Sequence, residues 1–250
     1  MLARRKATGK VDAQPTKAAK LAVKGPTYRL IAPPAGVDRD IVDTLWADVE
    51  SKLPALVARL DARALEPGDD QLLFCYVAMA AVRHPSFSLV AEELQRQLGA
   101  PPPSGDQVQY MRVAALDNQL ALLAGWRWRV LHAPTDVPRL MITDRGWIYV
   151  CEPYRTKHSL FLPMGPRVAI LGYLDAPDLP ARRAPFEEHF DLCQSWVEWF
   201  NAVAWDDPHI DVLVAHPDDR YLLENLPHHH DLRVTDLGPY RFRVTQGLMD

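Results

Sequence analysis

The stretch from Leu140 to Leu174 constrains the fold most, because it holds the densest run of strand-like segments in the chain. Apolar and β-branched residues form these segments, and turn-forming residues separate them. The segments span residues 140–142, 147–151, 160–162 and 168–174. Pro153 and Pro163 interrupt them, since proline cannot donate a hydrogen bond within a sheet. The pattern predicts an antiparallel meander, and helical segments elsewhere predict an α+β fold with several helices packed on this sheet.

Helical periodicity fills the chain before this stretch and returns after it. Apolar residues recur every three or four positions over 37–60, 87–98, 108–124 and 186–205. Residues 71–82 are apolar on all sides, which predicts a buried helix. Pro54 is expected to kink or divide the first helix, because its ring removes a hydrogen bond. The alternation over 126–131 predicts a strand with Arg127 and Arg129 on one face.

We expect a disordered basic arm over 1–25, followed by one α+β domain over 26–250 with a helical part at 37–125 and a sheet-rich part at 126–250. The length of 250 residues and the hydrophobic content of 48% suit a folded globular protein. Apolar runs are far shorter than the roughly 20 residues of a membrane-spanning helix, so we predict no membrane contact and a cytoplasmic location. The cysteines are widely separated among apolar residues, which predicts buried thiols in a reducing compartment. They are Cys75, Cys151 and Cys193.

An excess of positive charge distinguishes residues 1–25, here called the basic segment. Its net charge is +6 and that of the remainder is −10, since the whole chain carries −4. Its cations are Arg4, Arg5, Lys6, Lys10, Lys17, Lys20 and Lys24. One interpretation is a segment that binds an acidic protein surface or nucleic acid, with an affinity that falls as salt rises. The alternatives are a disordered, solubilising leader and, less well supported for lack of serine, a transit peptide.

Polar residues beside the strand-like segments are the candidates for a site. Asp144 follows an apolar strand, where a carboxylate could act on a substrate or position an arginine, although an isolated residue there is more often a turn aspartate. Arg83 follows the buried helix and Asn201 lies within an apolar helix, so both need partners if they are buried. The catalytic candidates, should the protein be an enzyme, are Asp144, His158 and Arg83. Arg145 and Asn201 join the cations of the basic segment as binding candidates.

The sequence contains no motif for a common cofactor or metal. With only 12 glycines, it has no phosphate-binding loop or dinucleotide fingerprint, and no GxSxG, HExxH or CxxC. His228, His229 and His230 are adjacent, so their side chains point in different directions and a solvated loop is the preferred interpretation. His216 before Asp218 fits a helix N-terminus better than an ion site. We therefore predict no metal and no cofactor.

A set of short motifs, taken in order, carries a family resemblance. The motifs are Glu50 in an acidic helix, Arg83-His84-Pro85, Trp126 before a strand, Ile142-Thr143-Asp144, Leu162-Pro163-Met164-Gly165-Pro166, and Asn201 in a late helix. Over roughly 43–226 the chain resembles the bacterial family called domain of unknown function 4238. It departs from the family where the basic segment replaces an opening histidine-tyrosine-proline motif, and where Arg145-Gly146 replaces asparagine and proline. The resemblance implies a fold and candidate positions, without an assigned reaction.

Three hypotheses for function follow. The first is a bacterial binding or regulatory protein that contacts an acidic protein or nucleic-acid partner. The second is a hydrolase, with a nuclease as the specific case, in which Asp144, Arg83 and His158 share a pocket. The third is a subunit of a larger assembly, which exposed tryptophans among Trp147, Trp196 and Trp199 would support. The sequence specifies neither the substrate nor the oligomeric state.

Helices 87–98 and 108–124 form a helical hairpin in our preferred interpretation, since the PPPSG linker does not suit a DNA-binding helix-turn-helix.

Overall fold

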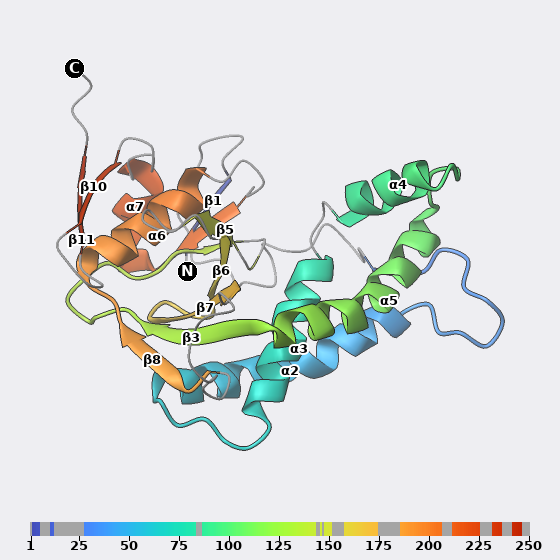
Figure 1. Ribbon diagram of the computed structural model, residues 1–250, viewed down its shortest axis with the longest axis horizontal. Helices are drawn as coiled ribbons and strands as arrows, with labels where there is room; N and C mark the ends of the chain where they lie inside the picture. Colours follow the sequence, from blue (N-terminus) through green and yellow to red (C-terminus); the bar gives the residue numbers. More distant parts are fainter. Residues whose placement is uncertain are drawn as a thin grey trace. The chain divides into compact units, whose positions relative to one another are not determined.

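In a computed structural model, the chain forms two compact units. Unit 1 comprises Met1–Ala22, Leu60–Ala64 and Arg127–Asp250, and unit 2 comprises Val23–Arg59 and Leu65–Trp126. The structure describes residues 2–5, 11–12, 28–83, 87–143, 146, 148–151, 158–174, 186–206, 212–225, 232–236 and 242–246. Unit 2 is helical and unit 1 is rich in strands (Figure 1). That 26–250 forms one domain stays a prediction.

The helices of unit 2 lie close to the predicted positions. They are α2 (Ile41–Asp61), whose last two residues belong to unit 1, α3 (Asp69–Arg83), α4 (Phe87–Gln97) and α5 (Gly105–Ala124). Trp46 of α2 is buried with Met79 and Val82 of α3 in the core of the unit. The helix α2 runs unbroken through Pro54, so the proline does not divide it. Burial of apolar residues on both sides of the proline offsets the hydrogen bond that its ring removes.

The start of α5 is fixed by a capping box. The hydroxyl of Ser104 accepts a hydrogen bond from the Gln107 backbone N–H (3.3 Å), and the Gln107 side chain accepts one from the Ser104 N–H (2.7 Å). These two bonds satisfy N–H groups that have no partner inside the helix. The helix therefore begins three residues earlier than its apolar stripe indicates, at Gly105 and not Val108.

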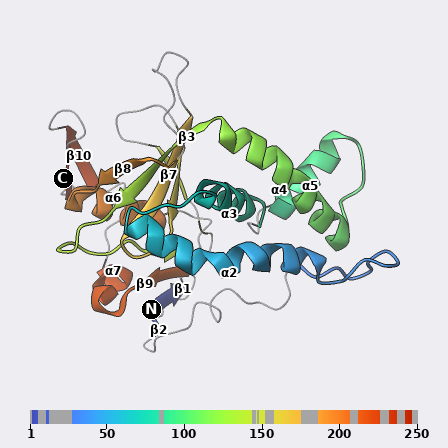
Figure 2. The same ribbon diagram turned by 90° about the horizontal axis from the view of Figure 1, so that it is seen from below.

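Unit 1 contains a five-stranded sheet in the order β5-β6-β7-β3-β8. Figure 2 labels its strands β7, β3 and β8. Its strands are β3 (Trp126–His132), β5 (Ile148–Cys151), β6 (His158–Pro163), β7 (Val168–Leu174) and β8 (Glu188–Asp191). Strands β5, β6 and β7 pair antiparallel, which confirms the last three segments of the predicted meander and, with the helices, the α+β class. The first predicted segment, 140–142, is not part of it, because Ile142–Thr143 pairs with residues 213–214 in another sheet. Strands β3 and β8 run parallel, so the sheet as a whole is mixed and not purely antiparallel.

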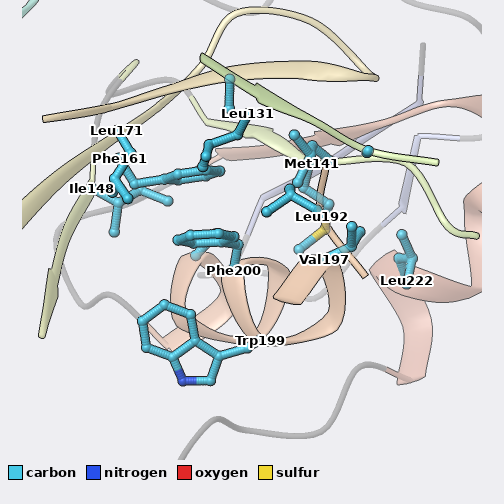
Figure 3. Packing of buried hydrophobic residues seen from close by; sticks show 14 of the residues in the cluster. Leu131, Met141, Ile148, Phe161, Leu171, Leu192, Val197, Trp199, Phe200 and Leu222 are labelled. Carbon is cyan, nitrogen blue, oxygen red and sulfur yellow. The ribbon is translucent and has the colours of Figure 1, made fainter. Parts of the chain in front are cut away.

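Helix α6 (Gln194–Asp206) packs against the sheet through a shared apolar core. Figure 3 shows Phe200 of α6 facing the strand residues Phe161 and Leu171. The rings of Phe161 and Phe200 stack at 3.9 Å between centroids and 6° between planes. Trp199 of the same helix is buried and meets Trp196 edge to face. Burial of several large aromatic side chains makes this contact a major source of stability.

Two smaller sheets complete unit 1. The first has the order β2-β1-β9-β4, built from Val11–Asp12, Leu2–Arg5, Val212–Ala215 and Ile142–Thr143. The second pairs β10 (Leu232–Asp236) with β11 (Phe242–Gln246). A 3-10 turn, η1 (Pro217–Asp219), precedes α7 (Arg220–Asn225). Within the basic segment, the backbone of β1 pairs antiparallel with β9. That residues 1–25 form a disordered arm stays a prediction.

The N-terminal part of the predicted helix 186–205 is a strand. Residues 188–191 form β8, and the helix begins only at Gln194. In the parallel register, Arg129 lies opposite Glu188 and His132 opposite Asp191. Pairing with β3 therefore overrides the helical spacing of the apolar residues, as tertiary contacts often do for short segments.

Trp128 of β3 lies directly on Gly172 of the neighbouring strand β7. A Cβ atom at position 172 would be 2.8 Å from Cε3 of the indole and closer still to two other ring atoms. Trp128 is buried and its ring also packs on Phe186, 5.5 Å away between centroids. Only glycine leaves room for the indole at this point of the sheet.

Substitution of Gly172 by alanine should destabilise the protein by about 1–3 kcal/mol, because the added methyl group overlaps a buried ring. Urea unfolding followed by tryptophan fluorescence measures the loss. The matched control is Gly105→Ala, where the new Cβ would lie 3.6 Å from Ile31, an ordinary contact. The control should be as stable as the wild type or slightly more stable. Equal stability of Gly172→Ala and the wild type would contradict the steric argument.

Candidate functional site

Two histidines on neighbouring strands of unit 1 form the most unusual polar contact in the described part of the chain. His132 ends β3 and His189 lies in β8, and the atoms His132 Nε2 and His189 Nδ1 are 2.8 Å apart. Their rings stack with 5.1 Å between centroids and 28° between planes. The register pairs His132 with Asp191, two residues beyond His189, so all three side chains leave the same face of the sheet.

An exposed ion pair lies beside the histidines. The guanidinium of Arg63 donates to the carboxylate of Asp191, and both side chains are largely in solvent, at 45% and 70% exposed. Solvent screens such a pair, so it contributes little to stability. Arg63 has φ = 55° and its N–H donates to the carbonyl of Leu60 at 3.1 Å, which ends α2. A residue other than glycine in this left-handed conformation is uncommon.

Burial and positive charge lower the pKa values of the two imidazoles. Burial is the first cause that lowers the pKa of His132, followed by the charges of Arg63 and His189, and Asp191 and Asp61 oppose these effects. For His189, burial and then Arg63 lower the pKa, against Asp191. Both values thus lie below the ordinary value of about 6.5. Neutral imidazoles with perturbed pKa values are the groups expected of an acid–base or proton-binding site.

The opposite face of the same strand pair carries charged groups that link β8 to β3. Arg129 and Arg127 contact the carboxylate of Glu188 at 2.9 Å and 3.4 Å. Their guanidinium groups lie over the ring of Tyr173, at 5.1 Å and 5.9 Å from its centroid. The prediction that Arg127 and Arg129 share a face is consistent with this common partner. The ion pairs and the His132–His189 pair therefore hold β8 from its two faces.

Unit 2 has a cationic cluster of its own. Arg83 donates to Glu50 and lies over the ring of Tyr28 at 5.0 Å, and the Tyr28 hydroxyl donates to the Arg83 carbonyl at 2.9 Å. Arg112, 4% exposed, donates to the Val82 carbonyl and lies over the Phe87 ring at 4.9 Å. These contacts join α2, α3 and α5 within the unit. Arg83 acts here as a packing and ion-pair partner of its own helices.

Asn201 has a well-defined structural role in unit 1. It is 1% exposed, its Oδ1 accepts from the Met141 N–H at 2.8 Å, and its Nδ2 donates to the Arg139 carbonyl at 2.9 Å. The amide thus satisfies two backbone groups of the segment before β4. Asn201 therefore has the partners that a buried amide needs, and it ties α6 to the segment before β4.

Most of the other candidate residues lie where the structure describes no side chain. Asp144 and Arg145 lie outside the described residues, as do Lys6, Lys10, Lys17, Lys20 and Lys24. Arg4 and Arg5 lie in β1, and His158 begins β6, opposite Cys151; only their backbones are described. Arg83 belongs to unit 2 and Asn201 to unit 1. A shared site of Asp144, Arg83 and His158 stays a prediction.

Other titratable groups mostly have local roles. The ring of His216 accepts from the Asp218 N–H at 3.3 Å and caps η1, as expected for a helix N-terminus. His228, His229 and His230 lie outside the described residues. Among the residues that are described, no group of three or more His, Cys, Asp or Glu side chains could hold a metal ion. Cys193 is exposed, because it lies just before the first turn of α6. The prediction of a buried thiol at Cys193 is therefore wrong. Cys75 is half-buried.

Sequence reasoning missed His132, His189, Arg63 and Asp191 as a group. The two histidines are 57 residues apart and Arg63 is 128 residues from Asp191. The alternation over 126–131 was visible and stops just before His132, but His189 lay in a segment with helical spacing. No local pattern pairs the two strands, so no motif could have brought these residues together.

No single helix within the described ranges is long and apolar enough to cross a membrane. Helices α3 and α4 reach the required length and apolar composition only together, as a pair bent by 68°.

Comparison with known proteins gives no match to a family model, a curated protein or a solved structure. The resemblance to domain of unknown function 4238 therefore stays a prediction.

Substitution Asn201→Ala should cost about 2–4 kcal/mol of unfolding free energy, because two buried backbone groups lose their only side-chain partner. Urea unfolding measures the change. The control on the same helix is Gln194→Ala, whose side chain is exposed and bonds only Glu198 at 2.6 Å. It should stay within about 0.5 kcal/mol of the wild type. A stable Asn201→Ala variant would remove the structural role and return Asn201 to the functional candidates.

Proposed function

We propose that the protein is a non-enzymatic binding or regulatory protein that contacts a polyanionic partner through the basic segment. The segregation of charge carries this proposal: +6 over residues 1–25 against −10 over the rest. A cationic segment attracts phosphates or carboxylates at long range, while the acidic remainder repels them. The partner is an acidic protein surface or a nucleic acid.

The attachment of the segment to unit 1 supports this proposal. Strand β1 pairs with β9 in antiparallel register, with Ala3 opposite Val214 and Arg4 opposite Leu213. The start of the segment is thereby tied to a folded unit by backbone hydrogen bonds. A partner bound by the following lysines would be held near that unit, which favours a binding role over that of a leader that only improves solubility.

The test is salt-dependent binding of the full chain to DNA, RNA and polyglutamate, measured by fluorescence anisotropy. Point variants are preferable to deletion of residues 1–25, since deletion removes β1 from its sheet. Replacing Lys6, Lys10, Lys17, Lys20 and Lys24 by glutamine should weaken binding by about tenfold or more at about 50 mM salt and reduce its salt dependence. The probe that binds identifies the partner class.

A charge-matched pair of variants controls for net charge. Lys17→Gln/Lys20→Gln and Lys52→Gln/Arg96→Gln each remove two positive charges, but Lys52 and Arg96 are exposed side chains of unit 2. The first variant should weaken binding and the second should not. Equal effects of both variants, or the absence of binding to all three probes, would refute the proposal.

A hydrolase is the second candidate function, and the His132–His189 pair favours it. A neutral imidazole oriented by a second group is the usual general base. The earlier candidates Asp144, His158 and Arg83 belong to the same hypothesis. Hydrolysis of single- and double-stranded nucleic acids, lost in His189→Asn and Asp144→Asn, would support it over the binding role.

The third hypothesis, a subunit of a larger assembly, receives less support. Trp199 is buried, and Trp196 is half-buried against the core of unit 1. Neither therefore offers the exposed aromatic surface that this role needs. Trp147 lies outside the described residues.

A further inference from the structure

Strand β8 lies at one end of the five-stranded sheet, and contacts of its side chains hold it there from both faces. Phe190 of β8 also packs against the apolar core of unit 1. The strand has four residues and pairs only with β3 within the five-stranded sheet. Ion pairs of Glu188 with Arg127 and Arg129 hold one face, and the His132–His189 pair holds the other. Beyond the strand, the Leu192 N–H donates to the His132 carbonyl at 2.8 Å. A change at the histidines therefore acts directly on the seam between β3 and β8.

We propose that the His132–His189 pair is a proton-controlled latch that holds β8 on β3 while the rings share a hydrogen bond and releases it when both rings are protonated. In the neutral pair, one facing nitrogen donates its proton and the other accepts it. A first added proton binds an outer nitrogen, and the shared bond survives. A second proton must bind the accepting nitrogen, which leaves two N–H groups and two positive charges face to face.

The surrounding charges set when the latch opens. Arg63, at the end of α2, opposes protonation, whereas Asp61 of α2 and Asp191 of β8 favour it. Across the strands, Glu188 accepts from Arg129 and contacts Arg127 on the other face. Burial of His132, which is 8% exposed, adds to the cost of charge. The latch is therefore closed at neutral pH and opens below the ordinary histidine pKa of about 6.5.

The direction of the effect on stability follows from the same shifts. The folded protein holds both pKa values below those of the unfolded chain. Their contribution to stability is present above about pH 6.5 and is lost as the pH falls through the folded values. Because the pair joins β3 to β8, we expect local release of β8 before global unfolding. Release exposes the backbone edge of β3, the kind of edge to which an extended peptide can add.

Hydrogen exchange of the full chain tests this latch. Exchange is measured at about pH 7.5 and about pH 5 and corrected for the intrinsic dependence of exchange on pH. Amides of β8 and of Leu192 should lose protection by about tenfold or more on acidification, whereas amides of β6 and β7 should keep theirs. Unchanged protection of β8 in the wild type would refute the proposal without any variant.

A conservative variant separates the latch from general acid sensitivity. In His189→Asn, the amide oxygen lies near the position of Nδ1 and accepts from His132 in either protonation state, so two charged rings never meet. Its β8 should stay protected at about pH 5. His132→Gln tests the reciprocal change, since its amide lies near the position of Nε2. If β8 lost protection on acidification in these two variants as much as in the wild type, groups other than the two histidines would release the strand.

The matched control is His216→Asn, which removes another histidine of unit 1 but keeps an N-cap acceptor for Asp218. This control should release β8 on acidification as the wild type does. A control that keeps β8 protected would place the pH response at His216 and refute the assignment to His132 and His189. NMR titration of the imidazole C–H signals adds a second measurement, in which two coupled steps below about 6.5 are expected.

Discussion

The contact of Trp128 with Gly172 is the constraint on which the sheet of unit 1 depends. Strand β3 lies between β7 and β8, and the missing side chain at Gly172 gives the indole its place over β7. The same indole packs on buried Phe186, two residues before β8 begins. Phe186 has φ = 64°, an uncommon conformation that this packing stabilises. The register of β8 on β3, and with it the meeting of His132 and His189, follows from this packing.

Most buried polar contacts of unit 1 serve the segment between β3 and β4. Arg167 donates to the carbonyls of Pro134, Val137 and Thr135, and Arg139 binds Asp219 at 3.0 Å. Asn201 binds the backbone on both sides of Leu140. These groups satisfy a connection that would otherwise leave its backbone unpaired. Within the described part of the chain, the rings of His132 and His189 bond each other and no backbone group. The proposed proton binding would account for a polar pair at this place.

Local patterns account for what could be predicted of this fold. The helices of unit 2 and the strands β5, β6 and β7 follow from apolar spacing and turn residues, because each element and its neighbours lie close together in the sequence. Strand β8 could not be found in this way. Its four residues carry no alternation of their own, and it forms by parallel pairing with a strand far along the chain. A pairing of this kind is decided by packing, here of Phe186 on Trp128.

The same distinction separates the candidate residues. Asn201 stood out because an amide within an apolar helix must have a partner, and that argument needs no knowledge of the fold. The partners themselves, the backbone groups of Arg139 and Met141, are known only from the structure. His132 and His189 carry no such mark, since a single histidine at the end of a strand or in an amphipathic segment is unremarkable. Their chemistry exists only as a pair, and the pair exists only in the folded sheet.

The roles proposed for the basic segment and for the histidine pair depend on different variables, because their charges differ in kind. Lysine and arginine stay charged throughout the range in which histidine titrates, so the proposed binding by the segment should depend on salt and hardly on pH. The histidines are partly buried and touch each other, so salt screens them weakly and protons control them. A partner held by the segment near unit 1 could therefore meet either a closed or an open edge of β3, according to pH. Salt and pH thus act as independent variables, through which the two devices can be examined separately in one chain.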